Sequence, residues 1–267
     1  MNILVCIKQV PDIEKIKIDS AKNEMIMTGV PNIVNQFDTY ALETAVRIKD
    51  ANPETRVIVV TMGPAQTKDA LKNCLSVGAD KAYMICDDIL SDSDTLVTSY
   101  VLSQAAKVIE EREGQPFSLF LCGKQAADGD TGHVGPQLAE YLGLPQITSA
   151  MEISIDGNKV LVRRLTEEGA EIKAAEMPAL VTMSQTEYEP RYASVKTKMA
   201  ANRAEIPVLT ASDLGLDAAC VGLGGSPSKL IKTFVPERKK GGLKIEEETG
   251  ELSAQKLVAL LSDAGAI

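Results

Sequence analysis

Residues 121–143 read LCGKQAADGDTGHVGPQLAEYLG and join a buried strand to a helix. The strand ends at Cys122, a loop of small and polar residues follows, and the helix begins near Val134. Free N–H groups at the start of a helix favour an anion, and glycines let the backbone approach it with no Cβ in the way. The stretch therefore predicts a site for a nucleotide phosphate, served by Gly129, Gly132 and Gly135.

Two well-known phosphate-binding motifs are not found here. No Walker spacing ends in Gly-Lys-Ser or Gly-Lys-Thr, and no G-x-G-x-x-G follows the first strand. The run GLGGSPSK at residues 222–229 contains Pro227 and has no βαβ unit around it, so it is not predicted to bind phosphate. A glycine-rich connection that binds nothing stays open as the alternative for the loop at 121–143.

His133 is the only histidine of the chain. A lone histidine in a polar loop is more often a solvated side chain or a local hydrogen bonder than a catalytic base. No Ser-His-Asp set and no pair of carboxylates with acid and base roles can be assigned. The sequence therefore predicts no catalytic residue and no hydrolytic chemistry.

Outward from this stretch, short apolar runs alternate with helical patterns. The runs 3–10, 57–62, 82–86 and 117–122 are typical of strands buried on both faces of a sheet. Helices are predicted over Asp38–Ala51, from Pro64 to Gly78, and from a cap at Ser93 or Asp94 to near Gly114. Such alternation predicts an α/β fold with a doubly wound, mainly parallel sheet.

The second half of the chain changes character. Two strand-like runs, 151–155 and 159–164, flank Asp156-Gly157-Asn158 and predict an added hairpin. Residues 179–183 form a further apolar run, and residues 184–202 show no persistent period, which is typical of a functional loop.

We expect a domain over residues 1–206 and a C-terminal arm over residues 207–267, with an amphipathic helix at Ser253–Ala264. The arm is too short to build a core of its own, which favours packing on a partner. Its apolar residues include Leu209, Leu214, Leu216, Leu223, Leu230 and Phe234.

Composition excludes several classes of protein. A net charge of −9, 4% aromatic residues and no Trp argue against nucleic-acid binding. No apolar run reaches the roughly 20 residues of a membrane span, and the N-terminus does not resemble a signal peptide, so we expect a cytoplasmic protein without membrane contact. The five scattered cysteines contain no C-x-x-C pair, which favours no metal site and no iron–sulfur cluster.

Several separate motifs resemble those of electron-transfer flavoprotein beta subunits. They are VCIKQVPD at 5–12, NQFDTYALE at 35–43, TMGPAQ at 61–66, SVGADKAY at 76–83, the loop at 121–146, and MPALVTMSQTEYEPRYAS at 177–194. The resemblance covers nearly the whole chain. It implies a heterodimer with an alpha subunit that holds one FAD, and a beta subunit that is not an enzyme alone.

The resemblance also implies where an adenine nucleotide binds. In the common form of the family the beta subunit holds a structural AMP, and in a bifurcating form the same pocket holds a second FAD that accepts a hydride from NADH. The run GDTGHVGP at 129–136 looks more like the bifurcating form. Carried over position by position, the expected site consists of Cys6, Asn35, Gln36, Phe37, Asp38, Met62, Gly123, Lys124, Gln125, Ala126, Ala127, Asp128, Gly129, Asp130, Thr131, Gly132, His133 and Val134.

The function implied is electron bifurcation. Electrons from NADH would pass through the beta-site FAD, one to the alpha-site FAD and an acyl-CoA-dehydrogenase-like partner, the other to ferredoxin or flavodoxin. Residues 184–202 are expected to dock that dehydrogenase through Val195, Met199 and Arg191. Two alternatives remain open: an electron carrier with AMP in the beta site, and a non-redox regulatory protein that binds an adenine nucleotide.

Overall fold

The computed structural model describes residues 1–19, 24–26, 28–231 and 242–267, and it confirms the predicted α/β class. The largest sheet within these ranges has nine strands: β1 Asn2–Cys6, β6 Arg56–Met62, β7 Lys81–Ile85, β8 Leu119–Gly123, β9 Gln146–Asp156, β10 Lys159–Thr166, β11 Gly169–Glu176, β12 Ala179–Met183 and β13 Val208–Leu209. Their order across the sheet is β11-β10-β9-β12-β8-β1-β6-β7-β13. The pairs from β9 to β13 are parallel, and β10 and β11 extend the sheet antiparallel.

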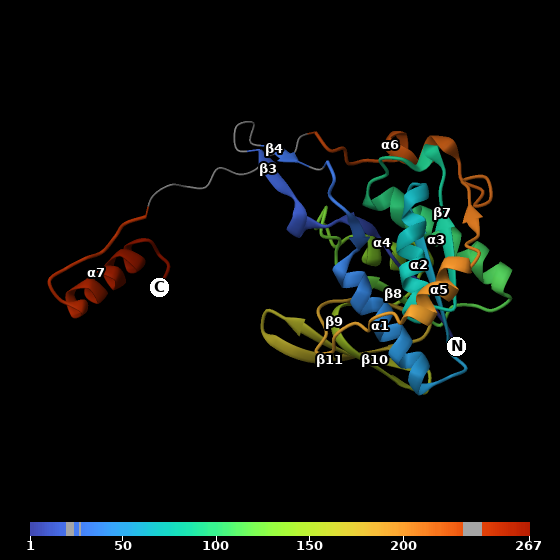
Figure 1. Cartoon of the computed structure of the whole chain (residues 1–267). Coiled ribbons are helices and arrows are strands. Elements are labelled where there is room, and N and C mark those ends of the chain that lie inside the picture. Colours follow the sequence, from blue (N-terminus) through green and yellow to red (C-terminus); the bar gives the residue numbers. More distant parts are fainter. Residues whose placement is uncertain (20–23, 27, 232–241) are drawn as a thin grey trace.

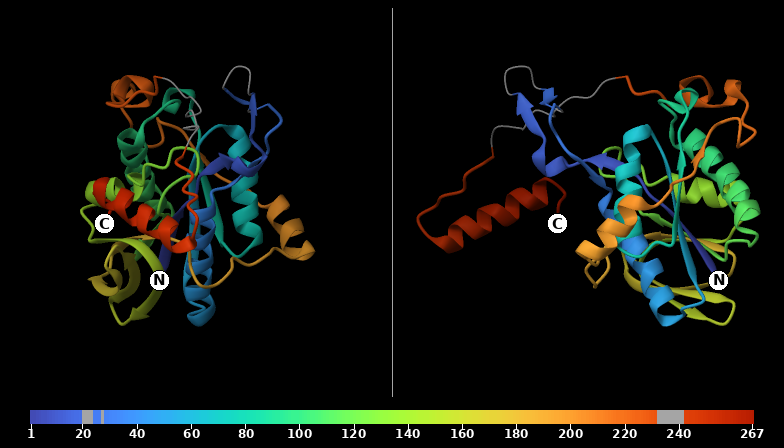
Figure 2. Two further views of the ribbon diagram at one scale, coloured as in Figure 1. Left: turned by 90° about the vertical axis from the view of Figure 1, so that its left-hand side faces the viewer. Right: turned by 45° about the vertical axis from the view of Figure 1, so that its right-hand side comes forward.

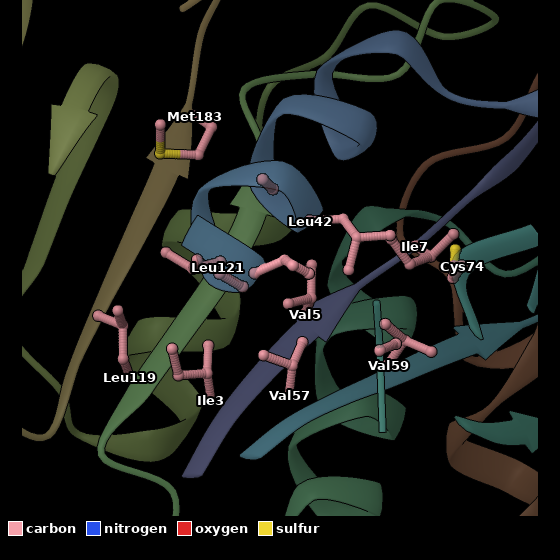
Figure 3. Packing of buried hydrophobic residues seen from close by; sticks show 14 of the residues in the cluster. Ile3, Val5, Ile7, Leu42, Val57, Val59, Cys74, Leu119, Leu121 and Met183 are labelled. Carbon is pink, nitrogen blue, oxygen red and sulfur yellow. The ribbon is translucent and has the colours of Figure 1, made fainter. Parts of the chain in front are cut away.

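Helices cover both faces of this sheet (Figure 1). Helices α1 (Gln36–Ala51) and α2 (Lys68–Ser76) pack on one face, and α3 (Thr95–Glu113) and α4 (Val134–Leu142) pack on the other. Figure 3 shows part of the first layer, where Leu42 of α1 turns toward Val5 and Ile7. Because fully burying each such aliphatic side chain contributes about 1.5–3 kcal/mol, these two layers hold the sheet together.

The direction in which the chain crosses the sheet reverses once next to β1. From β1 the chain moves to β6 and β7 on one side, then returns through α3 to β8 on the other side of β1. In open parallel sheets a ligand crevice lies beyond the carboxyl ends of the strands at such a switch point. Here that point lies between β1 and β8.

The residues predicted to begin and end α3 are confirmed, whereas one predicted strand is divided in two. Asp94 caps α3 through its side chain, and Gly114 ends α3 in the left-handed conformation. The predicted strand 3–10 is two strands, because β1 ends at Cys6 and β2 (Gln9–Pro11) pairs with β5 (Asn32–Val34) instead. A further small pair joins β3 (Lys17–Asp19) to β4 (Glu24–Ile26).

The predicted hairpin is confirmed and gains a third strand. Strands β9 and β10 meet at Gly157-Asn158, and β11 pairs with β10 along its whole length. The sequence of β11, GAEIKAAE, is rich in helix-forming residues, and its position at the sheet edge leaves most of its side chains exposed. Its strand conformation comes from pairing with β10 and not from local preference.

The expected irregular segment at 184–202 contains a helix. Ser194 accepts a hydrogen bond from the N–H of Thr197 and caps α5 (Val195–Arg203). The helix packs against α2 and buries only Ala201, which explains why no apolar period marks it in the sequence.

The arm begins inside the α/β domain. Strand β13 pairs with β7, and Leu209 and Leu214 are buried in the core between the sheet and α3, so these two residues pack within this domain and not on a partner as expected. Residues 222–228 also lie on this domain, since the N–H of Ser228 and the hydroxyl of Ser226 bond to Asp94. Leu223 and Leu230 are exposed, and Phe234 lies outside the described residues.

The last helix, α7 (Gly250–Asp263), begins earlier than predicted because Thr249 caps it. None of its residues is buried, and it stands apart from the sheet in all three views (Figures 1 and 2). Among the helices that the structure describes, none has the length and apolar character of a membrane span.

Candidate functional site

The loop between β8 and α4 lies at the switch point of the sheet and is fastened to the start of α1. Buried Asn35 donates from Nδ2 to the carbonyl of Gln125 (2.8 Å) and accepts at Oδ1 from the N–H of Ala127 (3.1 Å). Within the loop, the N–H groups of Gly129 and Asp130 donate to the carbonyl of Ala126. The loop therefore has a defined shape before any ligand enters.

Asp38, in the first turn of α1, connects the ends of the two strands at the switch point. Its Oδ2 accepts from the N–H of Lys8 (2.7 Å), and its Oδ1 accepts from the N–H of Gly123 (3.1 Å). Burial raises the pKa of this carboxyl from 3.8 to about 7, and the two N–H groups partly oppose that rise. Asp38 thus fastens the chain after β1 to the end of β8.

Two further carboxylates in the loop would repel a phosphate if they were free. Lys8 Nζ lies 2.7 Å from Asp128 Oδ1, and Gln125 Nε2 donates to Asp130 Oδ1. The ammonium group of Lys8 offsets the charge of Asp128, whereas the neutral amide of Gln125 only engages one oxygen of Asp130.

The first turn of α4 supplies the donors. His133 is the N-cap residue and its side chain makes no capping hydrogen bond, so backbone N–H groups at this end have no intrahelical partner. Gly132 has φ of +67° and Asp130 has φ of +56°, which bends the chain into the helix. A turn with left-handed residues followed by a helix N-terminus is a suitable binding place for phosphate.

Gly135 has a different role from the predicted one. A Cβ at Gly135 would lie 2.4 Å from Cγ2 of Thr182, so its missing side chain allows α4 to pack on β12. A Cβ at Gly129 would meet nothing within 4 Å.

The remaining predicted residues lie around the same edge of the sheet. Cys6 ends β1 beside Cys122, whose pKa is raised by the neighbouring Cys6 thiol and by burial, and half-buried Met62 ends β6. Exposed Gln36 and half-buried Phe37 begin α1. The structure thus brings the three strand ends, the start of α1, and the loop of Lys124, Ala126, Ala127, Thr131 and Val134 to one place.

Lys8 was missed as a site residue. It fixes Asp38 through its backbone and Asp128 through its ammonium group. Its position directly after the first strand, inside the motif VCIKQVPD, was the available signal. No group of three His, Cys, Asp or Glu side chains suited to a metal ion occurs in the described ranges.

Comparison with known proteins identifies the family. The electron transfer flavoprotein domain matches residues 23–214. An electron transfer flavoprotein subunit beta from Megasphaera elsdenii is 45% identical over 264 residues, or 98% of both chains. CarD, a caffeyl-CoA reductase-Etf complex subunit from Acetobacterium woodii, is 41% identical over 263 residues, also 98% of both. The protein FixA from Azorhizobium caulinodans is 38% identical over 243 residues, 90% of this chain and 86% of FixA.

The chain belongs to the electron transfer flavoprotein family. The resemblance seen in the motifs is confirmed, and the full-length match to a beta subunit agrees with the order of those motifs. Electron transport as an electron transfer flavoprotein beta subunit follows from this membership, and beta subunits of this family pair with an alpha subunit.

Replacing Gly123 with alanine should destabilise this electron transfer flavoprotein subunit. The new Cβ would lie 2.2 Å from Asp38 Oδ1 and 2.8 Å from the Cβ of Phe37. We expect a loss of about 1–3 kcal/mol in the free energy of unfolding, measured by urea denaturation of the heterodimer. Gly129→Ala is the matched control and should change it by less than about 0.5 kcal/mol. Equal effects of the two changes would contradict the packing described here.

The buried carboxyl of Asp38 predicts a pH dependence of stability. Because folding raises its pKa from 3.8 to about 7, the folded state holds the proton more tightly, and its contribution to stability is lost as pH rises through 7. Asp38→Asn does not titrate. The unfolding free energy of wild type should therefore fall relative to that of Asp38→Asn between pH 5 and pH 7, with urea denaturation as the measurement. A difference that stays constant would show that Asp38 has an ordinary pKa.

Proposed function

We propose that the chain binds an adenine nucleotide between the loop at 124–133 and the start of α4. The observation that carries this proposal is the convergence of a preformed loop and a helix N-terminus at the switch point of the sheet. The ion pair of Lys8 with Asp128 supports it, because it offsets one of the carboxylate charges of the loop. In this proposal the backbone N–H groups of residues 131–134 hold the phosphates.

We further propose that the nucleotide is FAD. When bound, FAD would accept a hydride and release electrons singly, and the protein would supply its position and electrostatic surroundings. Asn35 keeps the loop in shape, and Asp38 fixes where the loop leaves β8. Cys6 and Met62 contribute the apolar ends of their strands, and Lys124 lies exposed beside the loop.

In the proposed reaction the heterodimer takes two electrons from NADH and sends them along different routes. One electron goes to the flavin of the alpha subunit and then to an acyl-CoA-dehydrogenase-like partner, and the other goes to ferredoxin or flavodoxin. Two observations support this choice over the AMP-binding form: the run GDTGHVGP at 129–136, and the full-length likeness to a subunit of a caffeyl-CoA reductase complex. Family membership argues against a non-redox regulatory protein.

The proposed docking surface for the dehydrogenase is the outer side of α5 together with Tyr192, two residues before the cap of that helix. Tyr192, Val195 and Met199 expose 97%, 77% and 54% of their surface. Apolar anchors within a charged rim, here exposed Lys196 and Lys198, are typical of protein interfaces. The arm beyond residue 228, with exposed Leu257 and Val258 on α7, is proposed to pack on the alpha subunit, and NADH as donor favours a cytoplasmic location.

The nucleotide content of the purified heterodimer tests the cofactor. Acid release should yield two FAD and no AMP per heterodimer, and NADH should bleach the flavin under anaerobic conditions. A heterodimer with Gly132→Val is the control, because φ of +67° is strained for a β-branched residue, and it should lose one FAD. One FAD with one AMP would establish the AMP-binding form instead.

Val195→Asp tests the docking surface. A charge in place of a central apolar anchor should raise the apparent Kd for an acyl-CoA dehydrogenase about tenfold or more and leave flavin content unchanged. The measurement is stopped-flow reoxidation of dithionite-reduced heterodimer by increasing concentrations of that dehydrogenase. Lys198→Ala on the same helix should have little effect, since rim charges chiefly alter association rate. Unchanged transfer by Val195→Asp would remove the docking role.

A further inference from the structure

Arg191 faces inward in the structure, although it lies in the segment proposed to dock a partner. Its Nε and Nη2 donate to the two carboxylate oxygens of Glu43 at 2.8 and 3.0 Å, and its backbone N–H donates to Glu43 Oε2 at 3.1 Å. A second bond joins Nη2 to Asp50 at 2.7 Å. The Glu43 side chain is only 5% exposed, so this bidentate pair is shielded from water on one side.

Tyr188 makes a second attachment to the same helix. Its hydroxyl lies 2.6 Å from Oγ1 of Thr44, and the guanidinium of Arg47 lies over its ring at 4.4 Å from the centroid. Glu43, Thr44, Arg47 and Asp50 follow the three- and four-residue spacing of one helical stripe. One face of α1 therefore holds both Tyr188 and Arg191.

The attachments stop where the exposed apolar side chains begin. Tyr192 follows Arg191 directly, Ser194 caps α5, and Val195 is the first residue of that helix. Helix α5 is also fixed from the other side by its packing on α2. Only Tyr192 and Ala193 lie between Arg191, the last residue held by α1, and the cap at Ser194.

We propose that Arg191 and Tyr188 are positioning residues, which clamp residues 188–191 onto α1 so that Tyr192, Val195 and Met199 form one preset docking surface. This inference rests on the proposed docking function of that surface. Ordering the segment before binding removes an entropy cost from association. Replacing Arg191 therefore acts on affinity for the partner without removing a direct contact to it.

The same α1 helix also holds the nucleotide loop through Asn35 and Asp38, one to two turns before Glu43. The clamp and the loop thus share a single rigid element. We expect the clamp variants to leave the nucleotide in place, because the bonds at the start of α1 do not involve Arg191 or Tyr188.

The experiment uses the complete heterodimer with Arg191→Gln, Arg191→Lys and Tyr188→Phe, and Arg203→Gln as the control. Arg203 is the last residue of α5, is exposed, and takes part in no ion pair among the described residues. Amide hydrogen exchange over 188–194 should become about tenfold faster in Arg191→Gln, with strands β1, β6 and β8 unchanged. Stopped-flow reoxidation by an acyl-CoA dehydrogenase should show a raised apparent Kd and an unchanged limiting rate.

Arg191→Lys should restore the charge but not the bidentate geometry, and so give an intermediate apparent Kd. Tyr188→Phe keeps the ring over Arg47 and should be milder. Uniformly faster exchange throughout the chain would overturn the proposal, since Arg191 would then only stabilise the fold. An unchanged apparent Kd in Arg191→Gln beside a raised one in Val195→Asp would overturn the clamp and leave the docking surface standing. No effect of either change would mean that the docking function itself fails.

Discussion

The carboxylate of Asp38 accepts backbone N–H groups from Lys8 and Gly123, the residues that follow and end the two strands on either side of the switch point. The pairing of β1 with β8 ends at Val5 and Leu121, and beyond it Asp38 provides the acceptor for both N–H groups. Burial makes the charge on Asp38 costly, as its raised pKa shows. The hydrogen bonds offset that cost, and the absence of a Cβ at Gly123 gives the carboxylate its space.

From this point α1 organises two surfaces. Its first turn fixes the loop at 124–133 through Asn35, and its middle turns hold Tyr188 and Arg191. In the proposed function the site needs no acid or base of its own, because the bound cofactor would supply the chemistry. The chain would contribute placement: donors at the start of α4, the Lys8–Asp128 ion pair beside them, and an exposed apolar face on α5.

Sequence patterns predicted the parts of the fold that depend on local chemistry. The buried runs of β6 and β8, the cap at Asp94 and the Gly157-Asn158 turn each have a clear local signature, and the structure confirms them. Strand β11 and helix α5 escaped because pairing with β10 and packing on α2 decide their conformations. At the site, the motifs identified the loop. They did not show that Asp38 and Arg191 turn inward, because Asp38 contacts Gly123, 85 residues away along the chain, and Arg191 contacts Glu43, 148 residues away.

Amide hydrogen exchange at Lys8 and Gly123 tests the central role of Asp38 most directly. In the wild-type heterodimer both amides should exchange slowly, at rates close to those within β1 and β8. Asp38→Asn replaces one carboxylate oxygen with an NH2 group, which cannot accept a hydrogen bond from a backbone N–H. The variant should therefore accelerate exchange at Lys8, Gly123 or both, while the strand interiors stay protected. Fast exchange of both amides in the wild type, or equal protection in the variant, would contradict the account.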